Sequence, residues 1–308
     1  MTAHTTETLL KEIRQWKEKN DVCILAHAYQ SHEIWEAADY VGDSYGLSVK
    51  AANAPQQTIL MCGVRFMAET AKILSPEKKV LLAQPLAGCP MADQYDRQAA
   101  LRLREGHPGY KLAAYINTSA ALKTVADVVV TSSSAVRILE AMPDSDILFV
   151  PDCQLGSWTA AQLPEKNIHL VEGGCPAHTR FRAADVETAR RRHPQALLLC
   201  HPECLGEVTE HADYVGSTTG IIDFAKNSDA EEFIIGTECS IVQHLQYDCP
   251  DKRFYPLSTA CVCNDMRITT LADVWHAVRG DGGEEIKLDE ATLRDARRCI
   301  DRMIELGG

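Results

Sequence analysis

Three cysteines occupy equivalent places along the chain and could bind a metal together. Cys89, Cys175 and Cys263 lie 86 and 88 residues apart, each in a short turn that contains glycine, proline or asparagine. Three thiolates that meet can hold zinc, with water as the fourth ligand, or a [4Fe–4S] cluster with one iron left open. His178, three residues after Cys175, could enter the same cavity or bond a backbone carbonyl. The register predicts a metal centre with one free position, and the absence of a C-x-x-C pair disfavours ordinary structural zinc.

Pairs of polar residues follow three apolar runs with the same period, and they are candidates for substrate binding or proton transfer. Each pair has i, i+2 spacing: His27 and Tyr29, Tyr115 and Asn117, His201 and Glu203. This spacing predicts that both members of a pair face one side of a strand. A histidine beside a glutamate is suited to proton transfer or to binding a carboxylate-bearing substrate. A structural role is the simpler interpretation for a single histidine, but three pairs in register favour function.

Hydroxyl residues follow the next apolar run of each unit, after an Ala-Asp step. Ser44, Ser132 and Thr218 stand where a strand leads towards a helix. They are candidate helix caps and equally candidate ligands for phosphate or carboxylate. Their neighbours Thr131 and Ser217 are expected to be caps.

The elements that must position these groups alternate between strand and helix. An amphipathic helix is expected over residues 6–19, and beyond it apolar runs typical of buried parallel strands alternate with helical segments. Two helices near 269–279 and 288–306 close the chain, with a flexible loop at 280–285 between them. The pattern predicts an α/β fold whose ligands bind at the carboxyl ends of parallel strands. The polar pairs and the hydroxyl residues lie at those ends.

The repeat divides the chain into three α/β units with small parallel sheets. We expect the units to pack around a pseudo-threefold axis, which would bring the three thiols together. The expected units are 21–108, 109–192 and 193–263, with terminal helices of 1–20 and 264–308 packing on the core. Units of this size are typical of small domains.

Composition narrows the class of protein. The chain has 308 residues, a formal net charge of −12 and a pI of about 5.4, which argue against binding to nucleic acid or to a membrane surface. No apolar run is long enough to span a membrane, and the polar N-terminus lacks the apolar region of a signal peptide. A cytoplasmic location is therefore expected, where the 12 cysteines would not form disulfides. No dinucleotide or P-loop motif occurs in a strand–turn–helix context, so a nucleotide cofactor is not expected.

The chain resembles the quinolinate synthases, the A proteins of bacterial NAD biosynthesis. The match runs through AHAYQ, GDSYGLS, CGVRFMAETAKIL, AGCPMAD, YINTSAALK, TSSSAV, PDCQLG, CPAH, HPEC, ADYVGSTTGII and CNDMRITTL. The resemblance implies three homologous α/β/α domains around a pseudo-threefold axis, with an oxygen-sensitive [4Fe–4S] cluster at the centre. It also implies condensation of iminoaspartate (iminosuccinate) with dihydroxyacetone phosphate, which yields quinolinate, phosphate and two waters.

Residues with implied roles follow from the matching motifs. The cluster ligands fall on Cys89, Cys175 and Cys263, and the open iron would bind substrate oxygen and assist loss of water. Glu203 is the leading proton-transfer residue, with Tyr29 and His201 assisting isomerisation and ring closure. Substrate contacts fall on a wider set: His27, Ser44, Tyr115, Asn117, Ser132, His178, His201, Glu203 and Thr218.

The resemblance also implies partner proteins. The family works beside an aspartate oxidase or dehydrogenase, and cluster loading implies contact with Fe–S assembly proteins.

Cys261 and Cys263 form C-x-C, and the CNDM match favours Cys263. The C-x-x-C-x-x-C end of some members is absent, so their thiol–disulfide switch is not implied here. A thiolate–zinc lyase or hydratase and a non-catalytic Fe–S protein are the competing interpretations of the three cysteines.

Overall fold

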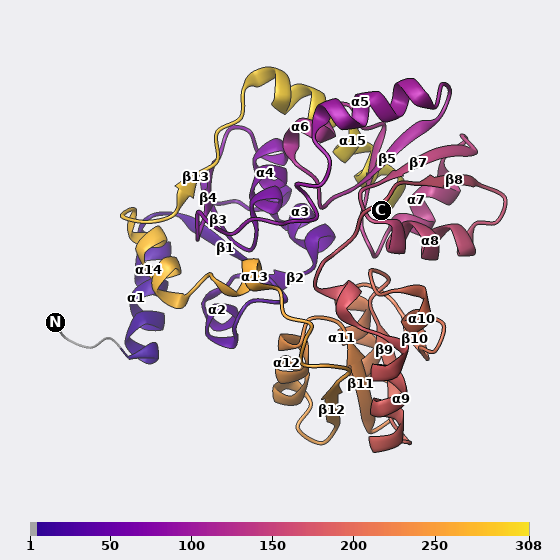
Figure 1. The fold of residues 1–308 in the computed structure, drawn as a ribbon. Coiled ribbons are helices and arrows are strands. Elements are labelled where there is room, and N and C mark those ends of the chain that lie inside the picture. Colours follow the sequence, from indigo (N-terminus) through magenta and orange to yellow (C-terminus); the bar gives the residue numbers. More distant parts are fainter. Residues whose placement is uncertain (1–4, 308) are drawn as a thin grey trace.

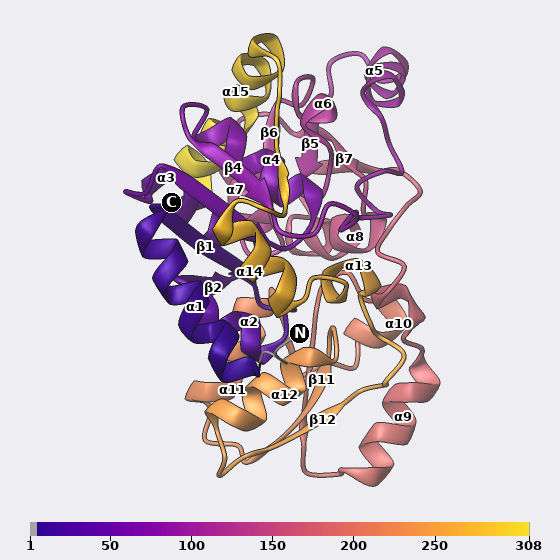
Figure 2. The same cartoon turned by 90° about the vertical axis from the view of Figure 1, so that its left-hand side faces the viewer.

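The protein, described here by a computed structural model over residues 5–307, contains three α/β units with one strand order (Figures 1 and 2). In each unit the first strand lies between the second and the third, and the fourth lies at the far side of the third. These four strands are parallel in every unit. The repeated order confirms the predicted α/β fold of small parallel sheets.

Each unit alternates strands and helices. The first contains α1 Thr6–Lys19, β1 Val22–His27, α2 His32–Ala37, β2 Tyr40–Gly42, α3 Ser44–Asn53, β3 Thr58–Cys62, α4 Arg65–Leu74 and β4 Lys79–Leu82. The second contains α5 Arg97–Gly106, β5 Lys111–Tyr115, α6 Ala120–Lys123, β6 Val128–Val130, α7 Ala135–Ala141, β7 Asp146–Val150, α8 Cys153–Gln162 and β8 Asn167–Leu170. The 3₁₀ turn His178–Arg180 leads into the third unit, which contains α9 Ala183–Arg192, β9 Leu197–Cys200, α10 Gly206–Thr209, β10 Tyr214–Val215, α11 Thr218–Asn227, β11 Glu232–Gly236, α12 Ser240–Asp248 and β12 Arg253–Pro256. The tail adds α13 Asn264–Arg267, α14 Leu271–Arg279, β13 Glu284–Glu285 and α15 Glu290–Gly307.

The tail closes over the first two units. The long helix α15 buries Ala296, Cys299, Ile300 and Met303, spaced as one face of a helix. That face packs on α4, α6, α7 and β6 and so joins the cores of the first and second units. The tail also adds β13 to the first sheet, antiparallel to β4. The expectation of a flexible loop over 280–285 was therefore wrong at its end, because backbone pairing to β4 orders residues 284–285.

An aspartate in each unit joins its first two strands, and it is the aspartate of the Ala-Asp step. Each accepts the backbone N–H of a residue 15 positions earlier, at 2.7–2.8 Å: Asp39, Asp127 and Asp213. Each also pairs, at 2.6–2.7 Å, with a basic residue on the helix before the unit's first strand: Lys17, Arg104 and Arg190. One carboxylate thus connects a helix and two strands, three times over.

A lysine that bonds the C-terminal end of a helix also recurs once in each unit. Lys78, Lys166 and Lys252 each donate their Nζ to backbone carbonyls at the C-terminal ends of α3, α7 and α11. Lys166, for example, lies 2.6 Å from the carbonyl oxygen of Met142. An ammonium at a helix C-terminus satisfies free carbonyls and opposes the negative end of the helix dipole.

The helix before each first strand packs on the sheet that follows it. Ala100 of α5 lies in one apolar cluster with Leu112 of β5, and Val186 of α9 lies in another with Leu198 of β9. Because α5 and α9 contact the following sheet, we propose that the second and third units begin near 96 and 182 rather than at 109 and 193.

Replacing Asp127 by alanine is expected to lower the free energy of unfolding by about 1–3 kcal/mol, because the buried Leu112 N–H loses its acceptor. The half-exposed ion pair to Arg104 adds little. Urea denaturation measures the change. Asp146→Ala, which removes an exposed carboxylate at the start of β7, is the control and should cost less than about 0.5 kcal/mol. Equal losses in the two variants would contradict the proposed role of the aspartate.

Candidate active site

One cavity brings together every residue that the sequence singled out for chemistry. It lies where loops of all three units and of the tail meet, and its volume is about 190 Å³. The cavity is lined by all thirteen predicted site residues: His27, Tyr29, Ser44, Cys89, Tyr115, Asn117, Ser132, Cys175, His178, His201, Glu203, Thr218 and Cys263. The three units therefore converge at this cavity, as the expected arrangement around one axis requires.

The three cysteines of the repeat line this cavity in loops, each from a different part of the chain. Cys263 lies at the cavity, whereas Cys261 is fully buried in the apolar core of the third unit. This placement favours Cys263 over its neighbour as a ligand. The charge of Cys263 contributes to the raised pKa of Cys89, and the charge of Cys89 contributes to the raised pKa of Cys175.

The electrostatic surroundings of the thiols fit a metal. Burial raises the pKa of Cys89 to about 12 and that of Cys263 to about 11, and it raises the pKa of Cys175 well above its ordinary value. Backbone N–H groups of the residues that follow each cysteine act in the opposite direction. Three partly buried thiolates at one cavity without a cation would be costly, whereas a metal centre would stabilise them. The donor set fits a thiolate-bound metal cofactor.

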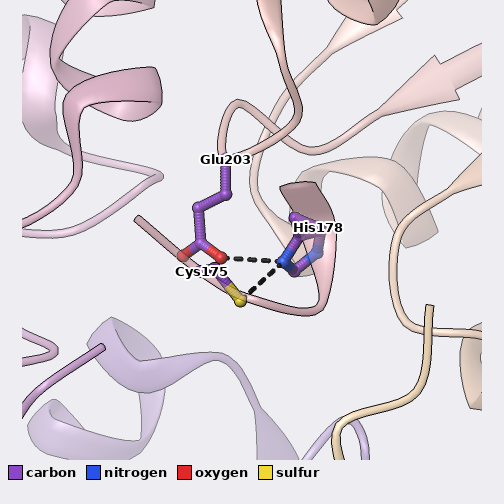
Figure 3. A group of neighbouring side chains, drawn as sticks. All are labelled: Cys175, His178 and Glu203. Carbon is purple, nitrogen blue, oxygen red and sulfur yellow. Dashed lines mark hydrogen bonds and ion pairs between the residues drawn. The ribbon is translucent and has the colours of Figure 1, made fainter. Parts of the chain in front are cut away.

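His178 connects one of these thiols to a buried carboxylate (Figure 3). Its Nδ1 lies 3.3 Å from the Cys175 Sγ and 2.8 Å from the Glu203 Oε2. Potential ligand atoms of these three residues all lie within 4.8 Å of one another. His178 therefore enters the cavity, as one of the two sequence interpretations predicted.

Two histidines that line the cavity accept a backbone N–H through the same ring nitrogen, Nδ1, in equivalent turns. The Nδ1 of His27 accepts the N–H of Tyr29 at 3.1 Å, and the Nδ1 of His201 accepts the N–H of Glu203 at 3.3 Å. Burial lowers the pKa of His27 to about 4 and that of His201 to about 3. Both rings are therefore neutral, and because Nδ1 accepts, we assign the proton to Nε2.

The prediction that each polar pair lies on one face of a strand was wrong. β1 ends at His27, β5 at Tyr115 and β9 at Cys200, so the second member of each pair lies beyond its strand. In the first and third units a tight turn follows, closed by the N–H of Gln30 or Cys204. The turn, and not the pleat, brings the side chains together.

Glu203 is a buried carboxylate held from two sides. Tyr115 donates its Oη to Oε1 at 2.5 Å, and His178 contacts Oε2. Burial alone would raise the pKa of Glu203, but the imidazoles of His201 and His178 and the hydrogen bond from Tyr115 hold the pKa below its ordinary value. Burial and the adjacent Glu203 raise the pKa of Tyr115, so this phenol stays protonated and donates. The site thus holds a charged, desolvated proton acceptor.

A hydrogen-bonded chain connects Tyr29 to Glu203 through a residue that the sequence analysis missed. Thr218 donates to the Tyr29 Oη at 3.0 Å, and the Tyr29 Oη lies 2.8 Å from the Thr237 Oγ1. Thr237 in turn lies 2.9 Å from the Nε2 of His178. Thr237 follows the third strand of its unit, whereas the polar residues predicted from the sequence follow the first two strands of each unit. Glu238, also lining the cavity, was missed for the same reason.

The hydroxyl residues divide between capping and facing the cavity. The caps of α3 and α11 are Asp43 and Ser217, which leaves Ser44 and Thr218 as the first helical residues beside the cavity. Ser217 is thus a cap, as predicted.

The prediction that Thr131 is a helix cap was wrong. Ser134 stands at the cap position of α7, and Thr131 uses its hydroxyl to bond Ser133 and Ser134. The run of hydroxyl residues made the start of this helix hard to place from sequence. Ser132 reaches the cavity from this turn.

Comparisons with known proteins show the family to which the chain belongs. Residues 11–305 match the family model described as quinolinate synthetase A protein. The quinolinate synthase of Caldicellulosiruptor saccharolyticus is 47% identical over 300 residues, covering 97% of this chain and 99% of the relative. That of Clostridium kluyveri is 46% identical over 298 residues, with coverage of 97% and 98%. Quinolinate synthase 2 of Methanosarcina acetivorans is 41% identical over 300 residues, with coverage of 97% and 96%. The chain therefore belongs to the quinolinate synthetase A protein family, a family of enzymes.

Proposed function

We propose that the enzyme condenses iminoaspartate with dihydroxyacetone phosphate to quinolinate, releasing phosphate and two waters, in de novo NAD biosynthesis. Membership of the family over nearly the whole chain supports the reaction. The observation that carries it is a single cavity lined by three thiols, one from each third of the chain, together with neutral imidazoles, hydroxyls and the charged Glu203.

Cys89, Cys175 and Cys263 are the proposed holders of a [4Fe–4S] cluster. The fit rests on three thiols beside backbone N–H groups at one cavity. When bound through three cysteines, the cluster would supply an iron with an open position, a Lewis acid for a substrate oxygen.

Anion binding is the task of the neutral donors. Both substrates carry negative charge, and among the described cavity-lining residues Arg180 is the one arginine or lysine side chain. The Nε2–H groups of His27 and His201 donate towards substrate oxygens. Ser44 and Thr218 stand at the first positions of α3 and α11, where free backbone N–H groups favour phosphate or carboxylate. Hydrogen bonds and helix termini thus supplement Arg180, the single cation among the described lining residues, in binding the substrate anions.

Proton transfer is assigned to Glu203, with Tyr29 and His201 assisting isomerisation and ring closure. The carboxylate is charged, and contacts from Tyr115 and His178 fix it at the cavity, where it is placed to accept a proton from bound substrate. The chain Tyr29–Thr237–His178–Glu203 gives the proton a route between two sides of the cavity. Iminoaspartate would come from an aspartate oxidase or dehydrogenase, and the cluster from Fe–S assembly proteins.

A zinc lyase or hydratase is the second candidate. The close approach of Cys175, His178 and Glu203 favours it, because a thiolate, an imidazole and a carboxylate can hold zinc with an open fourth position. The three-cysteine register supports the Fe–S alternative, because Cys89 and Cys263 have no role in a zinc site of that kind.

Anaerobic purification and turnover separate the two candidates. The synthase is expected to be brown, to contain about four irons and equivalent sulfide per chain, and to form quinolinate from iminoaspartate and dihydroxyacetone phosphate. A colourless protein with one zinc, or an iron–sulfur protein that forms no quinolinate, would overturn the proposal. Assay of the product by chromatography and of the metals by elemental analysis provides both readouts on one sample.

A further inference from the structure

Lys123, at the end of α6, is a fully buried cation with no place among the residues that line the cavity. Its Nζ donates to the carbonyl oxygen of Ile116 at 2.8 Å and to that of Thr118. Burial lowers its pKa to about 8, and nearby Glu69 acts in the opposite direction. The amine therefore remains mostly protonated at neutral pH and can donate to both carbonyls.

Those two carbonyls flank Asn117. The N–H of Thr118 bonds the Ile116 carbonyl at 2.8 Å, which makes a tight turn with Asn117 at its centre. Thr118 also bonds back to the Tyr115 carbonyl through its hydroxyl, at 3.0 Å. Lys123 thus fixes the backbone on both sides of one cavity residue.

The side chain of Asn117 is left ready for a ligand. Its Oδ1 is buried and has no hydrogen-bond partner among residues 5–307, and the residue lines the cavity. A buried amide oxygen without a partner is costly, so a partner is expected to arrive with the substrate. Because the turn is held at both of its carbonyls, the direction of this amide is set before binding.

We propose that Lys123 is a positioning residue, which clamps the turn at 115–118 and aims the carboxamide of Asn117 at the bound substrate. This inference rests on the proposed function of the cavity. The burial of the Lys123 ammonium is consistent with this role, because removing an ammonium from water is costly unless hydrogen bonds compensate, and here two carbonyls do so. The backbone of α6 is held from the tail as well, since Cys299 of α15 donates to the Lys123 carbonyl at 3.2 Å.

A double-mutant cycle in the iron-loaded enzyme tests the clamp. Lys123→Met keeps the length of the side chain but removes its donors, and we expect kcat/KM to fall by up to about 100-fold, mainly through KM. If Lys123 acts through Asn117, the double variant with Asn117→Ala will be no worse than Asn117→Ala alone. Lys166→Met is the control. Lys166 also bonds two carbonyls, those of Met142 and Asp144 just after α7, and its replacement should leave kcat/KM unchanged.

Hydrogen exchange supplies a readout independent of turnover. Lys123→Met should speed amide exchange in residues 111–123, whereas Lys166→Met should not. If Lys123→Met does not fold, Lys123→Gln, which keeps one amide donor, takes its place with a smaller expected loss. Independent, multiplying losses in the cycle, or unchanged exchange over 111–123, would overturn the inference. A wild-type enzyme that forms no quinolinate would instead overturn the proposed function, and exchange alone would then decide whether the clamp exists.

Discussion

Replacing Cys89, Cys175 or Cys263 by alanine is expected to prevent binding of the proposed cluster and to reduce quinolinate formation by on the order of 10³-fold or more. The three residues line one cavity, and no other thiol lines it among residues 5–307. Losing one of three protein ligands leaves a cluster that the site cannot retain, and the Lewis acid is lost with it. Iron and sulfide content, visible absorption and quinolinate formation, all measured under anaerobic conditions, check the prediction.

Cys261→Ala is the matched control because it lies two residues from Cys263 and is buried in the core of the third unit. This variant should keep its iron, its colour and its activity, with only a modest loss of stability. If Cys261→Ala lost the cluster while Cys263→Ala kept it, the assignment of the third ligand would be wrong. If all four variants kept their iron, the proposed site itself would be wrong.

Glu203→Gln is expected to lower kcat by about 10²–10⁴-fold while the enzyme keeps its full iron content. The amide can still accept from Tyr115 through one oxygen, but it cannot take a proton, and its NH₂ would face the ring nitrogen of His178. The loss should therefore appear in the chemical step. Anaerobic single-turnover formation of quinolinate, with iron analysis of the same sample, measures it.

Glu232→Gln supplies the control in the same unit. Glu232 begins β11 and pairs with Arg253 at the end of the sheet opposite to the cavity, and its replacement should leave the rate unchanged. An active Glu203→Gln enzyme would refute the assignment of proton transfer to this carboxylate. A variant that had also lost its iron would show that Glu203 supports the cluster instead.

The repeat made much of the site predictable. A fixed period identifies equivalent positions without any knowledge of packing, and so Cys89, Cys175 and Cys263 were found from their turns and spacing. The same argument found the polar pairs, because strand endings of equivalent units face one place. Their detailed geometry was not predictable from spacing, because hydrogen bonds in the turns after β1 and β9 set it.

Contacts between distant segments explain what the sequence did not reveal. Thr237 matters because it lies between Tyr29 and His178, which are 208 and 59 residues away. Lys123 is buried by the packing of α15 on α6, and its Nζ bonds carbonyls of the turn at 115–118; no periodic pattern in the sequence indicates these contacts. The pairing of β13 with β4 likewise joins segments some 200 residues apart. The period of the repeat identifies equivalent positions in the three units, but the contacts that each side chain makes depend on the tertiary fold.

The central claim is that three thiolates from three units hold a four-iron cluster whose remaining iron faces the substrate. Mössbauer spectroscopy of anaerobic ⁵⁷Fe-loaded enzyme, with and without quinolinate, tests it most directly. The account predicts about four irons per chain, of which one changes its signal when quinolinate is added and three do not. A spectrum without a four-iron cluster, or one in which quinolinate changes none of the irons, would contradict it.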